Sequence, residues 1–384
     1  MTASTPPGAT ADVKAKATGF FRAQQVGDRW WLITPGGHGF ISVGLNHLEE
    51  TDLQYPHNAE VYRERYGTRE KWLAEAALPD LREWGFNTLG WTQQWVTGRA
   101  EGRVDWDVPI DLGHSLGWSG GEVRGAGMPY VQQLRVAPIE DWNGNPVFPD
   151  VFSDKFAEHC DYLARQYCFG AAQDPNLIGY FLTDIPAWLR HSTGKHFGEL
   201  DDVPGSAAHE DLLYKIADQY YKTVVEAIRR YDPNHLVLGD RYNGNKGIPP
   251  AVLHAAADHV DVLSIQYFCG TDQASFDQMR DDLAAWSAQA GKPVLIADIG
   301  NMAPTDLNPH RYNGLADQRA RGENYVDSLA TVLGEPWFVG WHWCGYLENL
   351  SRGWGLKSPY DEPYEDMTTR VAEFNHGIYT RIGG

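Results

Sequence analysis

LIGYFLTD, at residues 177–184, is the stretch that decides the fold. It is a continuous apolar run that ends in a polar tip, Thr183 and Asp184. Such a run is typical of a parallel strand that is buried on both faces and whose carboxyl end reaches a functional site. We expect seven further strands from similar runs: GFISVGLN (39–46), GFNTLGW (85–91), PYVQQLRV (129–136), LVLGD (236–240), VDVLSIQYF (260–268), PVLIAD (293–298) and FVGWHWC (338–344).

Amphipathic segments of helical period lie between these runs. Phe156, Cys160, Leu163 and Tyr167, for example, follow one another at spacings that place them on one face of a helix. Strands that alternate with helices predict a parallel sheet with helices outside, and eight units favour closure into a (β/α)₈ TIM barrel. An open doubly wound sheet is the alternative. It is disfavoured because no Gly-rich phosphate loop follows any of the runs.

A single barrel domain is expected to cover residues 19–384, and it includes segments beyond the eight strands and their helices. Residues 1–18 are polar and small, which predicts a disordered tail. GFFRAQQ (19–25) and RWWLI (29–33) predict a β-hairpin before the first barrel strand. Residues 104–128, where we expect no helix, and 189–210 are long connections after strands, and both are expected to form part of the substrate-binding wall.

Composition limits the partners of the protein. The net charge of −19 disfavours nucleic acid and an anionic membrane surface, whereas a neutral sugar remains compatible with it. The 15 Trp and 19 Tyr supply flat faces that suit sugar rings as well as protein cores. The four cysteines show no metal-type spacing, and no apolar run is long enough for a signal peptide or a membrane span. We therefore expect a cytoplasmic protein with free thiols, no cofactor and a carbohydrate substrate, and a homo-oligomer is compatible with the sequence.

Catalytic groups of such barrels lie at the carboxyl ends of the strands. Reading the tips of the eight runs gives the candidates Asn46, His47, Asn87, Trp91, Asp184, Asp240, Arg241, Gln266, Tyr267, Asp298, His342, Trp343 and Glu348. Asp184 and Asp298 are the pair that we single out, because the fourth and seventh strands stand on facing walls of a closed barrel. Hydrolysis of a glycosidic bond needs one carboxyl group to protonate the leaving oxygen and one to attack or to activate water.

Several of the candidates also have structural interpretations. An Asp at a strand end can cap a helix or bond a backbone amide. Asp240 and Arg241 can form a buried salt bridge between adjacent strands. His342 can bind a sugar hydroxyl, bind a metal or pack in the core, and no second His or Cys stands beside it at metal-ligand spacing. We therefore predict no metal site.

Seven segments of the chain resemble, in order, the barrel segments of the family 50 glycoside hydrolases, which are β-agarases within a clan of retaining (β/α)₈ enzymes. The segments are residues 19–46, GFNTLGW, MPYVQQL, DPNLIGYF, LGDRYNGN, KPVLIADIG and GWHWCGYLEN. The resemblance runs from about Gly19 to the end of the chain. It implies a carbohydrate substrate and hydrolysis by double displacement, and it implies that a Tyr near the end of the sixth strand, here Tyr267, contacts the nucleophile.

The chain departs from the family at both catalytic positions. The family carries an Asn-Glu pair at the end of the fourth strand, and GYFLTDIPAW places Asp184 at the Asn and Ile185 at the acid/base Glu. Asp298 stands at the position of the Glu nucleophile. An Asp carboxylate is withdrawn by about 1.5 Å relative to Glu, which is enough to abolish attack in a site built for Glu.

Three explanations of these departures remain open. Asp184 and Asp298 can act as a reorganised pair on another linkage, a wider pair can admit water and give inversion, or hydrolysis can be lost while sugar binding is kept. We favour a glycosidase that is not specific for agar. The alternatives are a non-catalytic sugar-binding barrel and a metal-dependent sugar isomerase or lyase with Asp184, Asp240, Asp298 and His342 as ligands.

Overall fold

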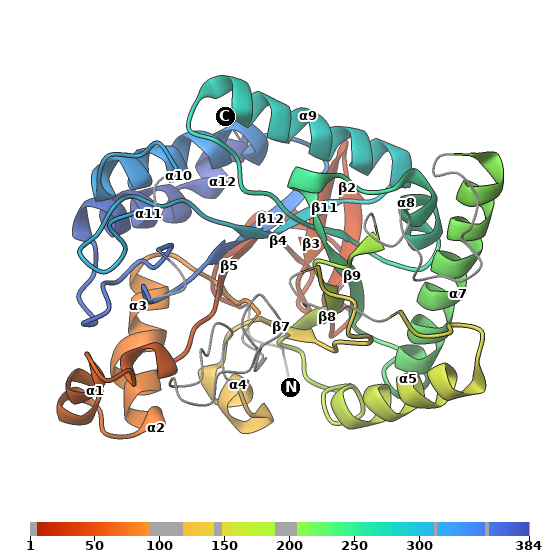
Figure 1. Ribbon diagram of the computed structural model, residues 1–384, viewed down its shortest axis with the longest axis horizontal. Helices are drawn as coiled ribbons and strands as arrows, with labels where there is room; N and C mark the ends of the chain where they lie inside the picture. Colours follow the sequence, from red (N-terminus) through yellow and green to blue (C-terminus); the bar gives the residue numbers. More distant parts are fainter. Residues whose placement is uncertain are drawn as a thin grey trace.

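Eight parallel strands close into a barrel in the order β10-β11-β12-β5-β6-β7-β8-β9 (Figure 1). The computed structural model describes residues 6–91, 118–141, 148–188, 206–310, 313–349 and 353–383. The predicted TIM barrel is confirmed. Its strands are β5 (Ser42–Asn46), β6 (Thr88–Leu89), β7 (Tyr130–Gln133), β8 (Leu177–Asp184), β9 (Leu236–Asn243), β10 (Leu263–Gln266), β11 (Val294–Ile299) and β12 (Phe338–Cys344).

The predicted run at residues 39–46 is divided between two sheets. Its first part belongs to β4 (His38–Phe40), which lies in an antiparallel sheet, and its second part is the barrel strand β5. The division falls at Ile41, whose backbone N–H donates to the hydroxyl of Tyr379 at 3.0 Å instead of to a strand. The run LIGYFLTD, in contrast, matches β8 at both ends.

An N-terminal sheet of four strands, in the order β1-β4-β3-β2, precedes the barrel. The predicted hairpin is formed by β2 (Arg22–Val26) and β3 (Arg29–Ile33), which pair antiparallel. The expectation of a disordered tail over residues 1–18 is wrong for β1 (Ala9–Lys14), which pairs with β4. The edge of β4 offers backbone hydrogen bonds to any chain, so the polar composition of this segment does not prevent pairing. Residues 1–5 lie outside the described residues.

The N-terminal sheet closes the amino-terminal end of the barrel. Phe21, Leu32 and Phe40 are buried in one cluster with the side chains that fill the barrel interior, among them Ile178 and Leu238. The buried guanidinium of Arg29 in β3 donates to the carbonyl groups of Leu333, Gly334 and Phe338, which ties this sheet to the start of β12. Because this end is filled, the functional site is expected at the opposite, carboxyl end of the strands.

Helices surround the barrel on its outside (Figure 1). Several of them begin at a side-chain cap, as Ser153, Ser206, Asp272 and Asp317 each accept a hydrogen bond from a backbone N–H of the first turn. The helices are α1 (Ala59–Arg65), α2 (Arg69–Trp72), α3 (Leu78–Glu83), α4 (Gly120–Ala126), α5 (Asp154–Tyr167), α7 (Ala207–Tyr231), α8 (Pro250–Ala257), α9 (Gln273–Ala290), α10 (Gln318–Leu333), α11 (Glu365–His376) and α12 (Ile378–Gly383). No described helix combines the length and apolar character that crossing a membrane requires.

The two long connections are described only in part. Residues 104–117 and 189–205 of these predictions lie outside the described residues. Residues 118–128 contain α4, where the sequence had suggested no helix, because a capping box between Ser119 and Glu122 starts the helix despite its glycines. Residues 206–210 are the start of α7.

We predict that the closed end of the barrel carries much of the stability. Phe40 is fully buried in this cluster, whereas Phe169, in the turn after α5, is 70% exposed. Phe40→Ala is expected to lower the free energy of unfolding by about 3–5 kcal/mol, because it removes a buried ring and leaves a cavity. Phe169→Ala is the matched control and should change it by less than about 0.5 kcal/mol. Urea denaturation of both variants measures the difference, and equal effects would contradict the assigned packing.

Candidate active site at the mouth of the barrel

Arg241 lies at the centre of the candidate site. This side chain projects from β9 into the barrel and is 0% exposed. Its Nη1 donates to Oδ1 of Asp184 at 2.7 Å, and its Nη2 lies 3.1 Å from Oδ2 of Asp298. One guanidinium group therefore joins the two carboxylates that the sequence singled out, which come from β8 and β11.

Register irregularities direct these side chains inward. The pairing of β8 with β9 shifts between Phe181 and Asp184, and the pairing of β10 with β11 shifts where Gln266 meets Asp298. A shift of one residue turns a side chain to the other face of a strand. The two aspartates thereby reach the interior. Strict alternation of side chains along β11 would instead point Asp298 outward, because the preceding residue, Ala297, faces the interior.

Two amides add hydrogen bonds to the carboxylates. Gln266 Nε2 donates to Asp184 Oδ1 at 2.6 Å, and Asn46 Nδ2 donates to Asp298 Oδ1 at 2.9 Å. Asn46 is itself fixed by the backbone N–H of Trp91, which donates to its Oδ1 at 2.7 Å. Four of the predicted residues thus form one connected network with Arg241.

Aromatic rings enclose this network. The guanidinium carbon of Arg241 lies 4.6 Å from the ring centroid of Trp91 and 5.6 Å from that of Phe181. The His47 ring meets Trp91 edge-on at 4.9 Å between centroids, and its backbone N–H donates to the Trp91 carbonyl. Such contacts hold a guanidinium plane in a fixed orientation and add cation–π attraction.

Burial controls the electrostatics of the site. It raises the pKa of Asp298 above the usual range of an aspartic acid, and the charge of Asp184 acts in the same direction. The positive charge of Arg241 and the hydrogen bond from Asn46 lower this pKa and offset part of the rise. Asp298 is therefore protonated at a higher pH than an exposed aspartic acid, because the net shift of its pKa is upward.

The structure places three predicted residues on the outer faces of their strands. Asp240 accepts a hydrogen bond from the Tyr221 hydroxyl of α7 at 2.6 Å, and burial raises its pKa to about 6. The Tyr267 hydroxyl donates to Asp282 of α9 at 2.7 Å, so it points away from Asp298. Trp343 packs against Tyr325 of α10 with 5.0 Å between ring centroids.

Neighbours along a strand explain these placements. Arg241, Gln266 and His342 point inward, so Asp240, Tyr267 and Trp343, which adjoin them in the sequence, point outward. Both members of each pair are among the candidates that the sequence places at the strand tips. Only one member of each pair can face the interior of the barrel.

Three further predicted residues are not at the Asp184–Asp298 pair. His342 lies deeper in the barrel, where its Nε2 is hydrogen-bonded to Ser42 Oγ at 2.9 Å, and burial lowers its pKa to about 3. Asn87 accepts from the backbone N–H of Val43 and donates to the carbonyl of Ile41, before the strand tips. Glu348 is buried beyond β12 and accepts hydrogen bonds from Thr305, Asn308 and Tyr364.

Two buried polar residues near the site were not predicted from the sequence. Gln133 of β7 is 1% exposed, and neither its amide nitrogen nor its amide oxygen has a hydrogen-bond partner among the described residues. Glu140 is buried and ion-paired with Arg135; burial raises its pKa, and the charge of Asp184 contributes to the rise. Gln133 could have been found because it follows the interior residue Val131 by two positions. Glu140 lies in a connection, where no periodicity indicates its direction.

The backbone departs from common conformations at the tips of three strands. His47, Arg135 and Ile185 have φ values of 51°, 47° and 36°. For a β-branched residue such as Ile185 this region is strained, at a cost of about 1–3 kcal/mol. Two backbone hydrogen bonds hold Ile185: its N–H donates to the Arg241 carbonyl, and its carbonyl accepts from the N–H of Asp141.

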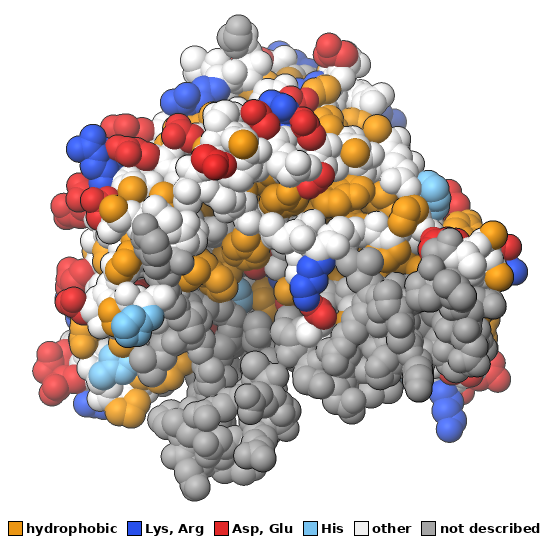
Figure 2. Space-filling view, turned by 45° about the horizontal axis from the view of Figure 1, so that its top comes forward, with side chains coloured by type: hydrophobic (Ala, Val, Ile, Leu, Met, Phe, Trp, Pro, Cys, Tyr) orange, Lys and Arg blue, Asp and Glu red, His pale blue; other side chains and the backbone are white. Residues whose placement is uncertain are grey.

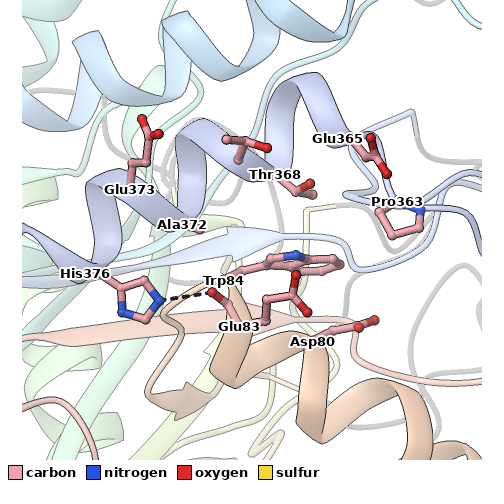
Figure 3. Close-up of a pocket in the computed structure, with 10 residues that line it drawn as sticks. Asp80, Glu83, Trp84, Pro363, Glu365, Thr368, Ala372, Glu373 and His376 are labelled. Carbon is pink, nitrogen blue, oxygen red and sulfur yellow. Dashed lines mark hydrogen bonds between the residues drawn. The ribbon is translucent and has the colours of Figure 1, made fainter.

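Two cavities adjoin the described chain. One of about 260 Å³ lies beside the tips of β8 and β9 and is lined by Ile185, Trp188, Tyr242, Asn243 and Lys246, among others. The other, of about 660 Å³, lies between α3 and α11, where Asp80, Glu83, Glu365 and Glu373 surround Trp84 (Figure 3). The second cavity is outside the barrel. Acidic side chains are also widespread on the face shown in Figure 2, in keeping with the net charge of −19.

Comparisons with known proteins identify sequence relatives that are named β-agarases. No family model matches it. It is 29% identical over 329 residues to β-agarase A of Vibrio sp. (strain JT0107), which covers 79% of this chain and 30% of the relative. It is 26% identical over 480 residues to β-agarase B of the same strain, and this match covers 95% of this chain and 49% of the relative. The chain thus spans less than half the length of either curated relative.

Solved structures show the same fold. The crystal structure of an agarase, AgWH50C, superposes with a TM-score of 0.72 and 20% sequence identity, covering 100% of this chain and 67% of that one. A β-glucuronidase of an uncultured Clostridium sp. superposes less well, with a TM-score of 0.54. Together with the two sequence relatives, these likenesses show a (β/α)₈ barrel that is similar in sequence to β-agarases.

Proposed function

We propose that this chain hydrolyses a glycosidic bond in a neutral oligosaccharide or glycoside, with Asp184 and Asp298 as its catalytic carboxylates. The observation that carries the proposal is the convergence of both carboxylates on Arg241 inside the carboxyl end of the barrel. Its relatives are named β-agarases, which supports an activity on carbohydrate. Glycosidic hydrolysis needs two carboxyl groups, and β8 and β11, which β9 and β10 separate in the barrel, supply one each.

In this proposal Asp298 is the nucleophile or the base that activates water. Asn46 and Arg241 hold its two oxygens in a fixed position, so attack does not require a search of rotamers. Asp184 is the general acid or the partner of that acid, and Gln266 and Arg241 orient it. Glu140 is a second candidate for the acid role, because it is a buried carboxyl group with a raised pKa close to Asp184.

The substrate of this chain is proposed to differ from agar. Ile185, an apolar residue, stands where the resemblance places the acid/base Glu, and Asp298 is shorter than the Glu nucleophile. A site with displaced carboxylates fits another linkage or anomer better than the bond for which the family geometry is built. We also propose a cytoplasmic location, which the four free cysteines support.

A non-catalytic sugar-binding barrel is the second candidate function. The apolar Ile185 at the acid/base position favours it, as does the engagement of both carboxylates by Arg241. The metal-dependent isomerase or lyase loses support, because Asp240 faces α7 and His342 lies deeper, bonded to Ser42, so these two do not join Asp184 and Asp298. Turnover separates the two remaining candidates.

Replacing the two carboxylates should abolish hydrolysis. In a screen against aryl α- and β-glycosides and oligosaccharides, Asp184→Asn and Asp298→Asn are each expected to lower kcat/KM at least about 100-fold for any glycoside that is cleaved, because a neutral amide replaces the acting carboxyl group. Asp240→Asn is the matched control, since this carboxyl group lies outside the barrel interior. Its kcat/KM should stay close to that of the parent. Tight binding without turnover, or variants as active as the parent, would remove the hydrolase proposal.

The dependence of hydrolysis on pH should report Asp298. Its carboxyl group must be ionised to act, and burial raises its pKa, so kcat/KM is expected to fall on the acidic side at a pH above the usual aspartate value of about 3.9. Arg241→Gln removes the cation that lowers this pKa, which should move the acidic limb to higher pH. The full pH profiles of both proteins measure the shift. A limb that stays in place or moves to lower pH contradicts the role of Arg241.

Gln133 is expected to contact the substrate. Gln133→Met keeps the length of the side chain and removes both amide atoms, so KM should rise about 2- to 10-fold, as for one lost hydrogen bond. The free energy of unfolding should stay equal or increase, because an unpartnered buried amide is unfavourable. Gln132→Met, on the opposite face of β7, is the control for both readouts. An unchanged KM with lowered stability would assign Gln133 to the core instead.

A further inference from the structure

A second group of side chains meets at Asp298. A ring nitrogen of His47, a carboxylate oxygen of Asp298 and the sulfur of Cys344 all lie within 4.8 Å of one another, and all three residues are buried. Among the described residues, this is the one group of three or more His, Cys, Asp or Glu side chains whose donor atoms lie close enough to share a metal ion. The residues come from three strands that are neighbours in the barrel. Asp298 belongs to β11, Cys344 ends β12, and His47 directly follows β5.

The three donors are those that zinc prefers. Zn²⁺ binds thiolate, imidazole and carboxylate groups at about 2.0–2.3 Å, and sites with three protein ligands keep a fourth position for water or substrate. Tetrahedral bonds of this length place the donor atoms about 3.3–3.8 Å apart. The side chains therefore need to converge by about 1–1.5 Å at most to surround an ion, which side-chain rotation supplies.

The charges around the group are compatible with a cation. The carboxylate of Asp298 and the thiolate of Cys344 balance the two charges of the ion. Arg241 approaches the same carboxylate, but its own charge is already compensated by Asp184 at 2.7 Å. Asn46 donates to Asp298 Oδ1, which supplies the neighbouring hydrogen bond that orients a ligating carboxylate.

We propose that His47, Asp298 and Cys344 bind one Zn²⁺ ion at the mouth of the barrel. On binding, the Cys344 thiol gives up its proton to solvent and the sulfur forms a bond to the metal, so the affinity should fall as the solution becomes more acidic. The ion engages the carboxylate that the proposed hydrolysis uses. Zn²⁺ is accordingly expected to inhibit cleavage of a glycoside, while metal binding itself does not depend on the hydrolytic activity.

Metal content and cobalt absorption test the proposal on the untagged full-length chain. After incubation with Zn²⁺ and desalting, elemental analysis is expected to find one equivalent per chain. With Co²⁺ in place of Zn²⁺, a thiolate-to-cobalt absorption band should appear in the near ultraviolet. A parent protein that keeps no zinc, or whose cobalt spectrum lacks that band, overturns the proposal without reference to any variant.

Two ligand variants and one control assign the residues. Cys344→Ser should remove the near-ultraviolet band and lower the affinity for Zn²⁺ at least 10-fold. His47→Asn should lower the affinity similarly, and Asn tolerates the positive φ of this position. Cys269→Ser alters another, half-buried thiol and should leave content and spectrum unchanged. Unchanged binding in Cys344→Ser also overturns the proposal.

The outcomes for metal and for hydrolysis are distinguishable. A protein that binds zinc but cleaves no glycoside would retain the metal site and remove the proposed hydrolase. A protein that cleaves a glycoside and binds no zinc would remove the metal site alone. If Zn²⁺ binds and inhibits hydrolysis, and Cys344→Ser relieves that inhibition, the metal site and the hydrolase are both supported.

Discussion

A buried guanidinium is the constraint on which the mouth of this barrel depends. Arg241 has no access to water, and an uncompensated charge in such a place is strongly destabilising, so opposite charges must come within reach. Asp184 and Asp298 meet this requirement from two sides. Removing one partner of a buried ion pair typically lowers the free energy of unfolding by about 3–5 kcal/mol. The groups that the proposed chemistry uses therefore also stabilise the strand tips.

The same arrangement connects structure to reactivity. Arg241 favours the charged form of the buried Asp298, whereas the charge of Asp184 opposes it. The pKa of Asp298 therefore depends on where these two neighbours lie. A substrate that enters between the two aspartates must disturb at least one contact of the guanidinium. Hydroxyl groups of a sugar are suited to take over such contacts, because they donate and accept hydrogen bonds without adding charge.

The sequence predicted the layout of the fold and only part of the site. Continuous apolar runs such as residues 177–184 and 338–344 gave strand bounds that the structure reproduces, because burial on both faces leaves a strong pattern. Faces were harder to assign. The register shifts near Asp184 and Asp298 depend on pairing with neighbouring strands, which one strand's sequence does not contain. Tyr267 and Trp343 face helices because their neighbours Gln266 and His342 face the interior. Gln133 follows the interior residue Val131 by two positions, so alternation along β7 was enough to indicate it.

The closed end of the barrel has a consequence for how the chain reaches its native state. Arg29 bonds the carbonyl of a residue 304 positions later, and the N–H of Ile41 bonds a hydroxyl 338 positions later. During synthesis, the first strands therefore emerge long before their partners in β12 and α12 exist. Contacts of such long range slow folding and leave apolar strands exposed in the meantime. We infer that β5 joins β12 as a late step of folding, once the last strand of the barrel has been synthesised.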